Sequence, residues 1–219
     1  LDQRTCVIEL TEIERIDRAH RVVEPAWHAV RQSHDHCFTF RIRGFRGLEI
    51  AEHGAGLDIV LANAGGGDFA TLADVTPEHY RANFDRNVAG TVFTVQKTLP
   101  LLNEGASIIL AGSTAASEGV PAFGLYAASK AAIRSLGRTW AAELADRKIR
   151  VNTIVPGPIE TPGLTGLAPA DQEQSLLDGM AVQVPMKRLG RPDEIASAVL
   201  FLASEQSSFM TGQAVIVDG

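Results

Sequence analysis

Short apolar runs alternate with longer segments of helical periodicity from residue 57 onward. Runs of four to six mostly apolar residues stand at 57–62, 107–111, 150–154 and 214–217. Their continuous apolar character predicts strands that are buried on both faces. Between them, the spacing predicts helices from 77 to about 102, from 122 to about 147 and from 192 onward, with a weakly helical stretch at 163–184.

This order of elements predicts the fold class. Buried strands separated by helices are typical of an α/β fold with a doubly wound parallel sheet, Rossmann-like, in three layers α/β/α. The length of 219 residues suits a single domain over 1–219. In such sheets ligands bind beyond the carboxyl ends of the strands, so we expect the chemistry just after residues 62, 111 and 154.

Composition and charge narrow the class of protein. Hydrophobic residues make up 45% of the chain, charged residues 21%, and the formal net charge is −6. These values are typical of a globular protein and argue against a nucleic-acid partner. No apolar run reaches the roughly 18 residues of a membrane span, and the first residues have neither the basic start nor the apolar stretch of a signal peptide. We therefore expect no membrane partner and a cytoplasmic location.

The two cysteines do not make a disulfide framework. One of them ends a His-Asp-His-Cys run at 34–37, whose residue types suit a metal ion. No second cluster at ligand spacing completes a four-ligand site. A polar loop or strand end is therefore favoured, and we expect no metal site.

Four polar residues stand where the predicted elements converge. Tyr126 and Lys130 are four residues apart in a predicted helix and hence share a face. An ammonium close to a phenol lowers the phenol's pKa, which suits proton exchange with an alcohol or carbonyl oxygen near neutral pH. Ser113, just after a strand, is placed to bind the same oxygen. Asn87 is placed to hold a water or a backbone carbonyl behind the lysine.

Each of these residues also has an ordinary structural interpretation. A Tyr-x-x-x-Lys pair arises by chance in many helices, and a serine such as Ser113 caps helices or occupies turns. Asn87 suits a surface position equally well. Their joint placement at two strand ends and on two helices of one α/β pattern favours the catalytic interpretation.

With these residues, the stretch 57–219 resembles the short-chain dehydrogenase/reductase family. The resemblance covers about three quarters of the chain. The family often has a second asparagine where this chain has Ala62. The residues that carry the resemblance are Asn63-Ala64-Gly65, Asn87, Ser113 thirteen positions before Tyr126, Tyr126-Ala127-Ala128-Ser129-Lys130, Pro156-Gly157-Pro158-Ile159-Glu160-Thr161, and the stretches 188–195 and 217–219.

The resemblance implies hydride transfer between a nicotinamide cofactor, NAD or NADP, and a small-molecule carbonyl/alcohol substrate. It implies Tyr126 as the acid/base and Lys130 as the residue that binds the nicotinamide ribose and tunes Tyr126. It implies that Ser113 positions the substrate oxygen and that Asn87 anchors a proton-relay water. The implied cofactor contacts, besides Tyr126 and Lys130, are Asn63, Ala64 and Gly65 on the adenosine side, Pro156 and Gly157, and Ile159 and Thr161 at the carboxamide.

The resemblance also implies a homo-oligomer and a lid segment that covers the substrate. The helices at 77–102 and 122–147 would form the interface of a homodimer or homotetramer. Residues 163–184 would form a lid over the substrate. The apolar side chains of this stretch either cover a partly apolar substrate or merely pack the lid down; they are Leu164, Leu167, Leu176, Leu177 and Met180.

The first 56 residues depart from the family pattern. The family opens with a glycine-rich turn that lets backbone N–H groups approach the pyrophosphate. The nearest candidates, Gly44-Phe45-Arg46-Gly47 and Gly54-Ala55-Gly56, lack its spacing. Three strand–helix units need about 75 residues, so this N-terminal part is shortened, divergent or incomplete, with a strand at 5–10 as one surviving piece. The choice between NAD and NADP is left open, and Arg41 and Arg43 are better explained as surface residues than as ligands of a 2′-phosphate.

Two hypotheses from different classes follow. The first is an NAD(P)-dependent oxidoreductase acting on a secondary alcohol or ketone, with 3-oxoacyl reduction as one candidate. The second is a non-catalytic fold relative with impaired cofactor binding that serves as a binding or scaffold protein. The intact set at 87, 113, 126 and 130 favours the enzyme, whereas the missing glycine turn favours the scaffold.

Overall fold

The computed structural model describes residues 5–8, 37–38, 41–42, 48–49 and 56–219. A six-stranded sheet has the order β2-β1-β5-β6-β7-β8, and every neighbouring pair in it is parallel. A second, antiparallel pair joins β3 (Arg41–Ile42) to β4 (Leu48–Glu49). The strands of the main sheet are β1 (Thr5–Ile8), β2 (Cys37–Phe38), β5 (Leu57–Ala62), β6 (Leu102–Ala111), β7 (Arg150–Pro156) and β8 (Ala214–Val217).

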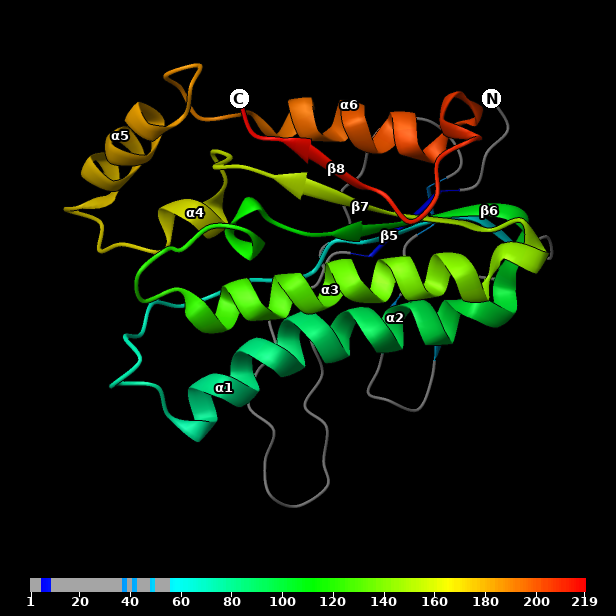
Figure 1. Cartoon of the computed structure of the whole chain (residues 1–219), viewed down its shortest axis with the longest axis horizontal. Helices are drawn as coiled ribbons and strands as arrows, with labels where there is room; N and C mark the ends of the chain where they lie inside the picture. The colour runs from blue at the N-terminus through cyan, green and yellow to red at the C-terminus, as the bar shows by residue number, and fades with distance from the viewer. Residues whose placement is uncertain (1–4, 9–36, 39–40, 43–47, 50–55) are drawn as a thin grey trace.

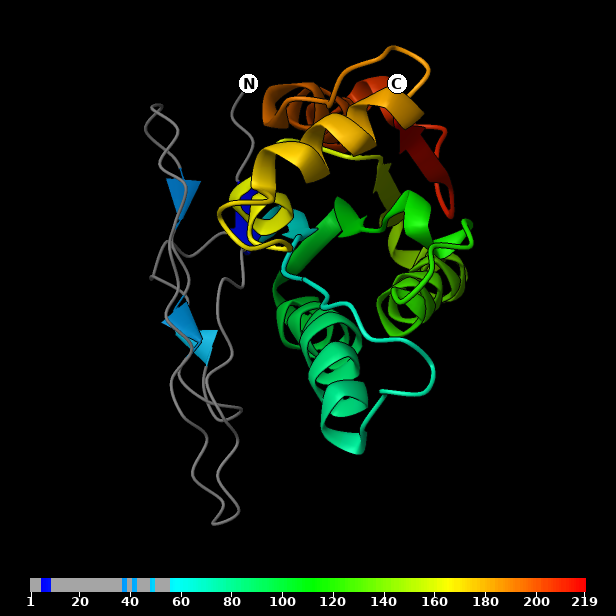
Figure 2. The ribbon, with the colours of Figure 1, turned by 90° about the vertical axis from the view of Figure 1, so that its left-hand side faces the viewer.

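Helices cover both faces of this sheet (Figures 1 and 2). One face carries α1 (Pro77–Phe84), α2 (Gly90–Thr98) and α3 (Gly124–Glu143), and the other carries α6 (Pro192–Ala203). The short α4 (Pro162–Thr165) and α5 (Glu173–Gln183) stand at one end of the sheet. The predicted three-layer α/β fold is confirmed. None of the helices in the described ranges is long and apolar enough to cross a membrane.

Alternate residues of the central strands pack against opposite layers. Val60, Ile108 and Leu110 contribute to the core under α2 and α3, whereas Ile59 and Ile109 contribute to the core under α6. All five side chains are at most 4% exposed. Burial of both faces explains why these strands are continuous apolar runs.

Two predicted element starts are wrong. The helix expected from 77 to about 102 is helical throughout Pro77–Leu101, with a π-helical turn at Asp85–Ala89, but the strand expected at 107–111 already begins at Leu102. The helix expected from 122 begins at Gly124, because Ala122 has a left-handed φ of 61° that a right-handed helix does not accept. The π turn matters for the site, since π-helical turns insert one extra residue and redirect side chains.

The N-terminal part contributes strands to the same sheet. The strand expected at 5–10 is confirmed as β1 over Thr5–Ile8, where it pairs with β5. Gly44, Gly47 and Gly54, which belong to the two candidate glycine turns, lie outside the described residues, as does Arg43.

Candidate active site

Tyr126 and Lys130 lie on one face of α3, as their spacing predicts. The Lys130 Nζ is 5.7 Å from the centroid of the Tyr126 ring. The helix is rich in alanine and holds Ser129, Lys130 and Ile133 in the interior, so this face of α3 is turned toward the sheet. The pair therefore stands beside the carboxyl ends of β5 and β6, where the chemistry was expected.

Lys130 is a buried cation, with only 3% of its surface exposed. Its Nζ donates a hydrogen bond to the carbonyl oxygen of Ala111, the last residue of β6, over 2.9 Å. Burial lowers the pKa of Lys130 from 10.5 to about 8, because the charged form loses its hydration. The end of β6 thus fixes where the ammonium lies.

Ser113 follows β6 and approaches Tyr126. The Ser113 side chain accepts a hydrogen bond from the backbone N–H of Ala115 over 3.2 Å, which fixes its orientation at the start of a short 3₁₀ turn. A further side-chain hydrogen bond joins Ser113 to Tyr126. The two hydroxyl groups can therefore share one substrate oxygen.

The pKa of Tyr126 moves in the opposite direction to the one expected from the sequence. Burial raises this pKa above 10, and the hydrogen bond with Ser113 opposes the rise. The expectation of a pKa lowered by Lys130 is therefore wrong for this structure. Desolvation of the phenolate dominates, because burial disfavours its charge more than the hydrogen bond with Ser113 favours it.

Asn87 braces the site from the π-helical turn. It is fully buried, and its Nδ2 donates to the carbonyl oxygen of Gly66 over 3.0 Å and to the Ser129 Oγ over 2.8 Å. Its Oδ1 accepts from the Gly66 N–H over 2.9 Å. Ser129 in turn donates to the carbonyl oxygen of Tyr126 over 2.7 Å. Both amide N–H groups of Asn87 are thus used within the protein, which matches the backbone-carbonyl alternative rather than a side-chain grip on a water.

The glycine turn after β5 lies directly against these side chains. A Cβ on Gly65 would stand 2.7 Å from the Lys130 Nζ and 2.9 Å from the Asn87 Oδ1. A Cβ on Gly67 would stand 2.6 Å from the Tyr126 Cδ2. All three separations are shorter than Cβ atoms normally show, so glycine is required at these two positions for close approach.

The segment after β7 is held by the loop that precedes α6. Gly190 donates to the Pro158 carbonyl over 3.0 Å, and Glu160 donates to the Gly190 carbonyl over 2.9 Å. A Cβ on Gly157 would stand 2.8 Å from Asp218, so this glycine packs against the end of the chain beyond β8. Ile159 and Thr161 are half-buried, and Thr161 precedes α4.

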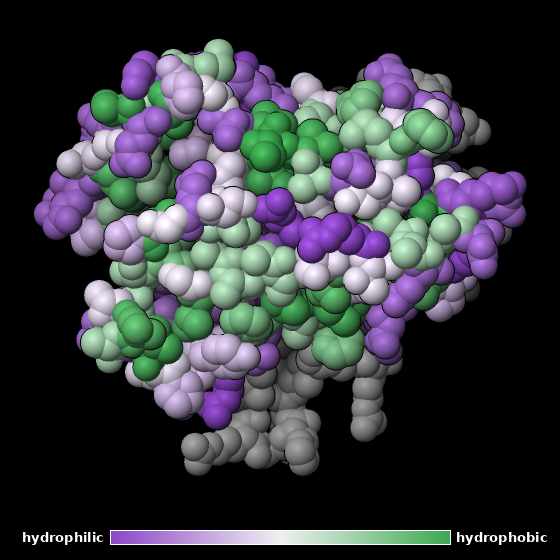
Figure 3. All heavy atoms as spheres, in the orientation of Figure 1, coloured by the Kyte–Doolittle hydropathy of each residue, from purple (hydrophilic) through white to green (hydrophobic). Residues whose placement is uncertain are grey.

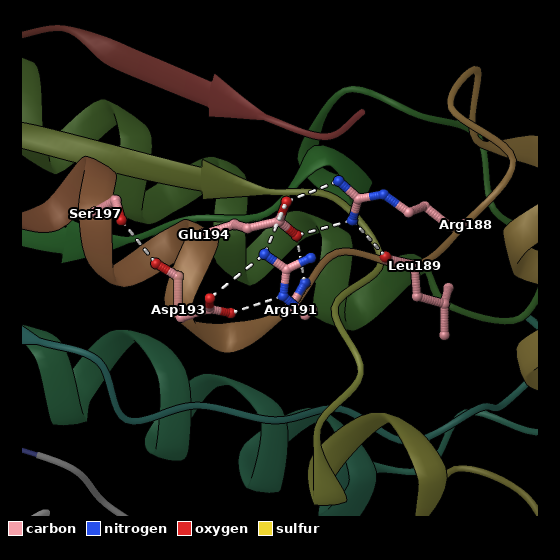
Figure 4. A network of polar contacts seen from close by, with 6 residues as sticks. All are labelled: Arg188, Leu189, Arg191, Asp193, Glu194 and Ser197. Atoms are coloured by element: carbon pink, nitrogen blue, oxygen red, sulfur yellow. Dashed lines mark hydrogen bonds and ion pairs between the residues drawn. The ribbon is translucent and has the colours of Figure 1, made fainter.

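An ion-pair network anchors that same loop (Figure 4). Arg188 donates two hydrogen bonds to the Glu194 carboxylate, over 2.8 and 2.7 Å. The Arg191 backbone N–H donates to the same carboxylate over 2.7 Å. Arg188 and Arg191 together lower the pKa of Glu194 from 4.5 to about 2. The carboxylate thus ties the start of α6 to the loop that carries Gly190.

The residues present fit a nicotinamide cofactor. Lys130 has three N–H donors, and one of them is used by Ala111, which leaves two that suit ribose hydroxyls. The glycine at 65 leaves room directly beside this ammonium, whereas any Cβ would fill it. Asn63 is exposed at the end of β5, and Ala64 is buried behind it.

One apolar side chain of the expected lid is buried. Leu177 in α5 is 9% exposed, and Leu164, Leu167, Leu176 and Met180 are half-buried. Of the two interpretations made from the sequence, packing accounts for Leu177. No group of three or more His, Cys, Asp or Glu side chains within the described ranges is arranged to hold a metal ion, and residues 34–36 lie outside these ranges.

Sequence reasoning missed three contributors to this site. Ser129 links Asn87 to the backbone of Tyr126, and Gly67 lies against the Tyr126 ring. Phe123 contacts the same ring, with centroids 4.4 Å apart. The available signals were the run of three glycines at 65–67 and an aromatic residue one helical turn before Tyr126.

Comparisons with known proteins show which family this chain is similar to. A family model described as Enoyl-(Acyl carrier protein) reductase matches residues 48–219. The "Oxidoreductase asL5" of Sarocladium schorii is 45% identical over 171 residues, which is 77% of this chain and 67% of the relative. The 3-oxoacyl-[acyl-carrier-protein] reductase FabG of Thermotoga maritima is 37% identical over 165 residues, which is 74% of this chain and 65% of the relative. The chain thus spans about two thirds of the length of these relatives.

Solved structures of short-chain dehydrogenases/reductases are also similar to this chain. The short-chain dehydrogenase/reductase "Glucose/ribitol dehydrogenase" from Brucella melitensis has a TM-score of 0.69 and 35% sequence identity, with 75% of this chain and 64% of that chain covered. A putative betaketoacyl-ACP reductase has a TM-score of 0.64 and 40% identity, with 75% and 68% covered. Fold and sequence agree: the chain belongs to the short-chain dehydrogenase/reductase family of oxidoreductases.

Proposed function

We propose that the protein is an NAD(P)-dependent oxidoreductase that interconverts a ketone and a secondary alcohol, with Tyr126 as the acid/base. The observation that carries this proposal is the convergence of Ser113 and Lys130 on Tyr126. Ser113 is hydrogen-bonded to the Tyr126 side chain, and the Lys130 ammonium lies 5.7 Å from the centre of the ring. A non-catalytic relative would have no need of a buried lysine beside Ser113 and Tyr126.

The raised pKa of Tyr126 favours a protonated hydroxyl at neutral pH. In the reductive direction this hydroxyl donates its proton to the carbonyl oxygen as negative charge develops there. Ser113 donates a hydrogen bond to the same oxygen and keeps it in line with Tyr126. In the oxidative direction Tyr126 has to start as the phenolate, which takes the proton from the alcohol and which the nearby Lys130 ammonium stabilises.

A nicotinamide cofactor, when bound, would provide the hydride chemistry at the carbonyl carbon. The Lys130 Nζ, held by Ala111, would bind the nicotinamide ribose hydroxyls through its remaining donors. Asn63, Ala64 and Gly65 would line the adenosine side. Ile159 and Thr161 would hold the nicotinamide carboxamide, and Pro156 and Gly157 would also contact the cofactor. Asn87 would act by bracing the glycine turn and α3 rather than by touching the substrate.

A 3-oxoacyl compound is one candidate substrate, because the Thermotoga maritima relative is named as a 3-oxoacyl-[acyl-carrier-protein] reductase. We further propose a homodimer or homotetramer, in which the helices at 77–102 and 122–147 would form one interface and the edge strand β8 would contribute to another. Apolar residues gather over β8 on the face shown in Figure 3, and Ile216 in this edge strand is 57% exposed. An exposed apolar edge strand is a surface that natural proteins normally cover.

Titration of the protein with NADH and NADPH, followed by nicotinamide fluorescence, tests the proposal. We expect at least one of them to bind at sub-millimolar concentration. The Tyr126→Phe variant should retain this binding and lose at least about 100-fold in turnover of a ketone, because it lacks the proton donor. Absence of binding of either cofactor at millimolar concentration would support the scaffold alternative instead.

A further inference from the structure

Three aromatic rings form a continuous row that ends at Tyr126. The Phe69 and Phe123 rings have centroids 4.8 Å apart with planes tilted by 32°. The Phe123 and Tyr126 rings have centroids 4.4 Å apart with planes tilted by 31°. Phe69 is 43% exposed, whereas Phe123 and Tyr126 are half-buried. The row therefore runs from the surface to the proposed proton donor.

Two loops from different strands hold this row in place. The loop after β5 carries Phe69, and the loop after β6 leads to Phe123 (Figure 1). The Ala70 N–H donates to the Ala122 carbonyl oxygen over 2.8 Å and joins the loops. Gly67 fixes the first loop against the Tyr126 ring. The row is thus built from backbone contacts and does not depend on the substrate to form.

We propose that Phe69 and Phe123 determine substrate specificity by stacking with a planar, conjugated or aromatic group attached to the substrate's carbonyl carbon. This inference rests on the proposed function, since it takes the substrate oxygen to be bound at Tyr126 and Ser113. Such a group is coplanar with the carbonyl and extends from the carbonyl carbon beside the row of rings. Aromatic faces and edges attract one another in tilted and offset arrangements such as those already present in the row.

An aliphatic ring of the same carbon number lacks this interaction. It is thicker than a flat ring, and it has no π face to complement the edge of Phe69 or Phe123. The apolar side chains of α4 and α5 would accept either kind of group, because burial of apolar surface is non-directional. Discrimination between flat and puckered groups therefore has to come from the aromatic row.

The test compares acetophenone with cyclohexyl methyl ketone, which have the same carbon skeleton. Dissociation constants are measured by ligand-observed NMR for the wild type, Phe123→Leu and Phe69→Leu. We expect the wild type to bind acetophenone about three- to tenfold more tightly than the cyclohexyl ketone, which is the range of an aromatic pair interaction. Phe123→Leu should remove this preference, and Phe69→Leu should reduce it.

Phe84→Leu is the matched control. Phe84 stacks on Tyr80 in α1 with centroids 4.6 Å apart, so this variant removes an equal ring from a pair outside the row. It should keep the wild-type preference. Far-UV circular dichroism checks that each variant is folded. If Phe123→Leu does not fold, Phe69→Leu decides the matter, because an exposed loop residue tolerates the change.

The outcomes separate this inference from the proposed function. Equal affinity for the two ketones in the wild type, or the same preference in all variants, overturns the specificity proposal even if NADPH- or NADH-dependent turnover is found. An equal loss of affinity for both ketones in Phe69→Leu and Phe123→Leu also overturns it. The rings would then only hold the loops in place. Binding preference without any turnover supports the aromatic row and contradicts the oxidoreductase proposal.

Discussion

Gly67 lies so close to Tyr126 that a single methyl group at position 67 would stand 2.6 Å from the Tyr126 Cδ2 and 2.7 Å from its Cβ. The Tyr126 side chain is therefore positioned from two sides, by its own helix and by the turn after β5. The contact joins the glycine turn, which belongs to the cofactor side of the site, to the proposed proton donor.

The Gly67→Ala variant should displace the Tyr126 ring. The backbone at Gly67 does not need a left-handed conformation, so the effect comes from the lost space alone. A misplacement of about 1 Å lowers turnover on the order of 100-fold. Steady-state kinetics with a ketone and the cofactor that binds would measure the fall in kcat. Gly119→Ala is the control, since a Cβ there meets nothing within 4 Å, and an equal fall in kcat for both variants would contradict the positioning role.

Asn87→Ala should lower both stability and turnover. It leaves the Gly66 N–H, the Gly66 carbonyl and the Ser129 hydroxyl without their buried partner. We expect the free energy of unfolding to fall by about 2–4 kcal/mol, because each unsatisfied buried group costs about 1–3 kcal/mol and the losses overlap. Urea denaturation measures the change. Ser129→Ala removes only part of this network and should cost about 1 kcal/mol; a larger loss for Ser129→Ala than for Asn87→Ala would argue against Asn87 as the centre of the brace.

Deprotonation of Lys130 should make the cofactor-free protein more stable as the pH rises above 8. The folded-state pKa is about 8 and the ordinary value is 10.5, so between these values the unfolded chain binds more protons than the folded one. Stability is lowest below pH 8, where the buried ammonium is charged, and increases toward pH 10. Between pH 7.5 and 9.5 the free energy of unfolding should rise by about 2 kcal/mol relative to Lys130→Met.

The comparison with Lys130→Met isolates this single group. Urea denaturation of both proteins at the two pH values provides the measurement. The methionine variant keeps most of the side-chain volume and should show no such rise, although it should lose turnover. A pH dependence shared by both proteins would show that Lys130 is not the group responsible. The window ends below pH 10 because Tyr126, with its raised pKa, acts in the opposite sense above that value.

Glu194→Gln should weaken cofactor binding, although residue 194 is not one of the proposed cofactor contacts. The variant loses the ion pair with Arg188 and loosens the loop whose Gly190 binds the segment at 158–160. We expect the cofactor KM to rise about two- to fivefold, which corresponds to an exposed ion pair. Asp193→Asn is the control, because Asp193 pairs only with the exposed side chain of Arg191 among the ion pairs that the structure describes.

The acid sensitivity of the same pair follows from its pKa. Glu194 has a folded-state pKa of about 2 against 4.5 normally, so its contribution is complete above pH 4.5 and is lost as the pH falls toward 2. Thermal melting between pH 5 and 2.5 should therefore decline less steeply in Glu194→Gln than in the wild type. An identical decline in both proteins would contradict this assignment.

The fold was largely predictable because its strands are buried on both faces. The predicted strands at 57–62 and 214–217 have the bounds observed for β5 and β8. The prediction was wrong where local geometry overrides periodicity, namely at the π turn around Asn87 and at Ala122 with its left-handed backbone. Both features depend on local backbone geometry, and the apolar periodicity of the sequence did not reveal either of them.

The sequence by itself determined the fold class, the family and the identity of the polar residues that converge at the strand ends. Residue spacing is sufficient for this, since Tyr126 and Lys130 share a helix face wherever that helix lies. Only the tertiary structure decided what those residues touch: the Ala111 carbonyl at Lys130, the Gly66 backbone at Asn87, and the rings of Phe69 and Phe123 beside Tyr126. It also decided the direction of the Tyr126 pKa, because desolvation depends on enclosure by segments distant along the chain.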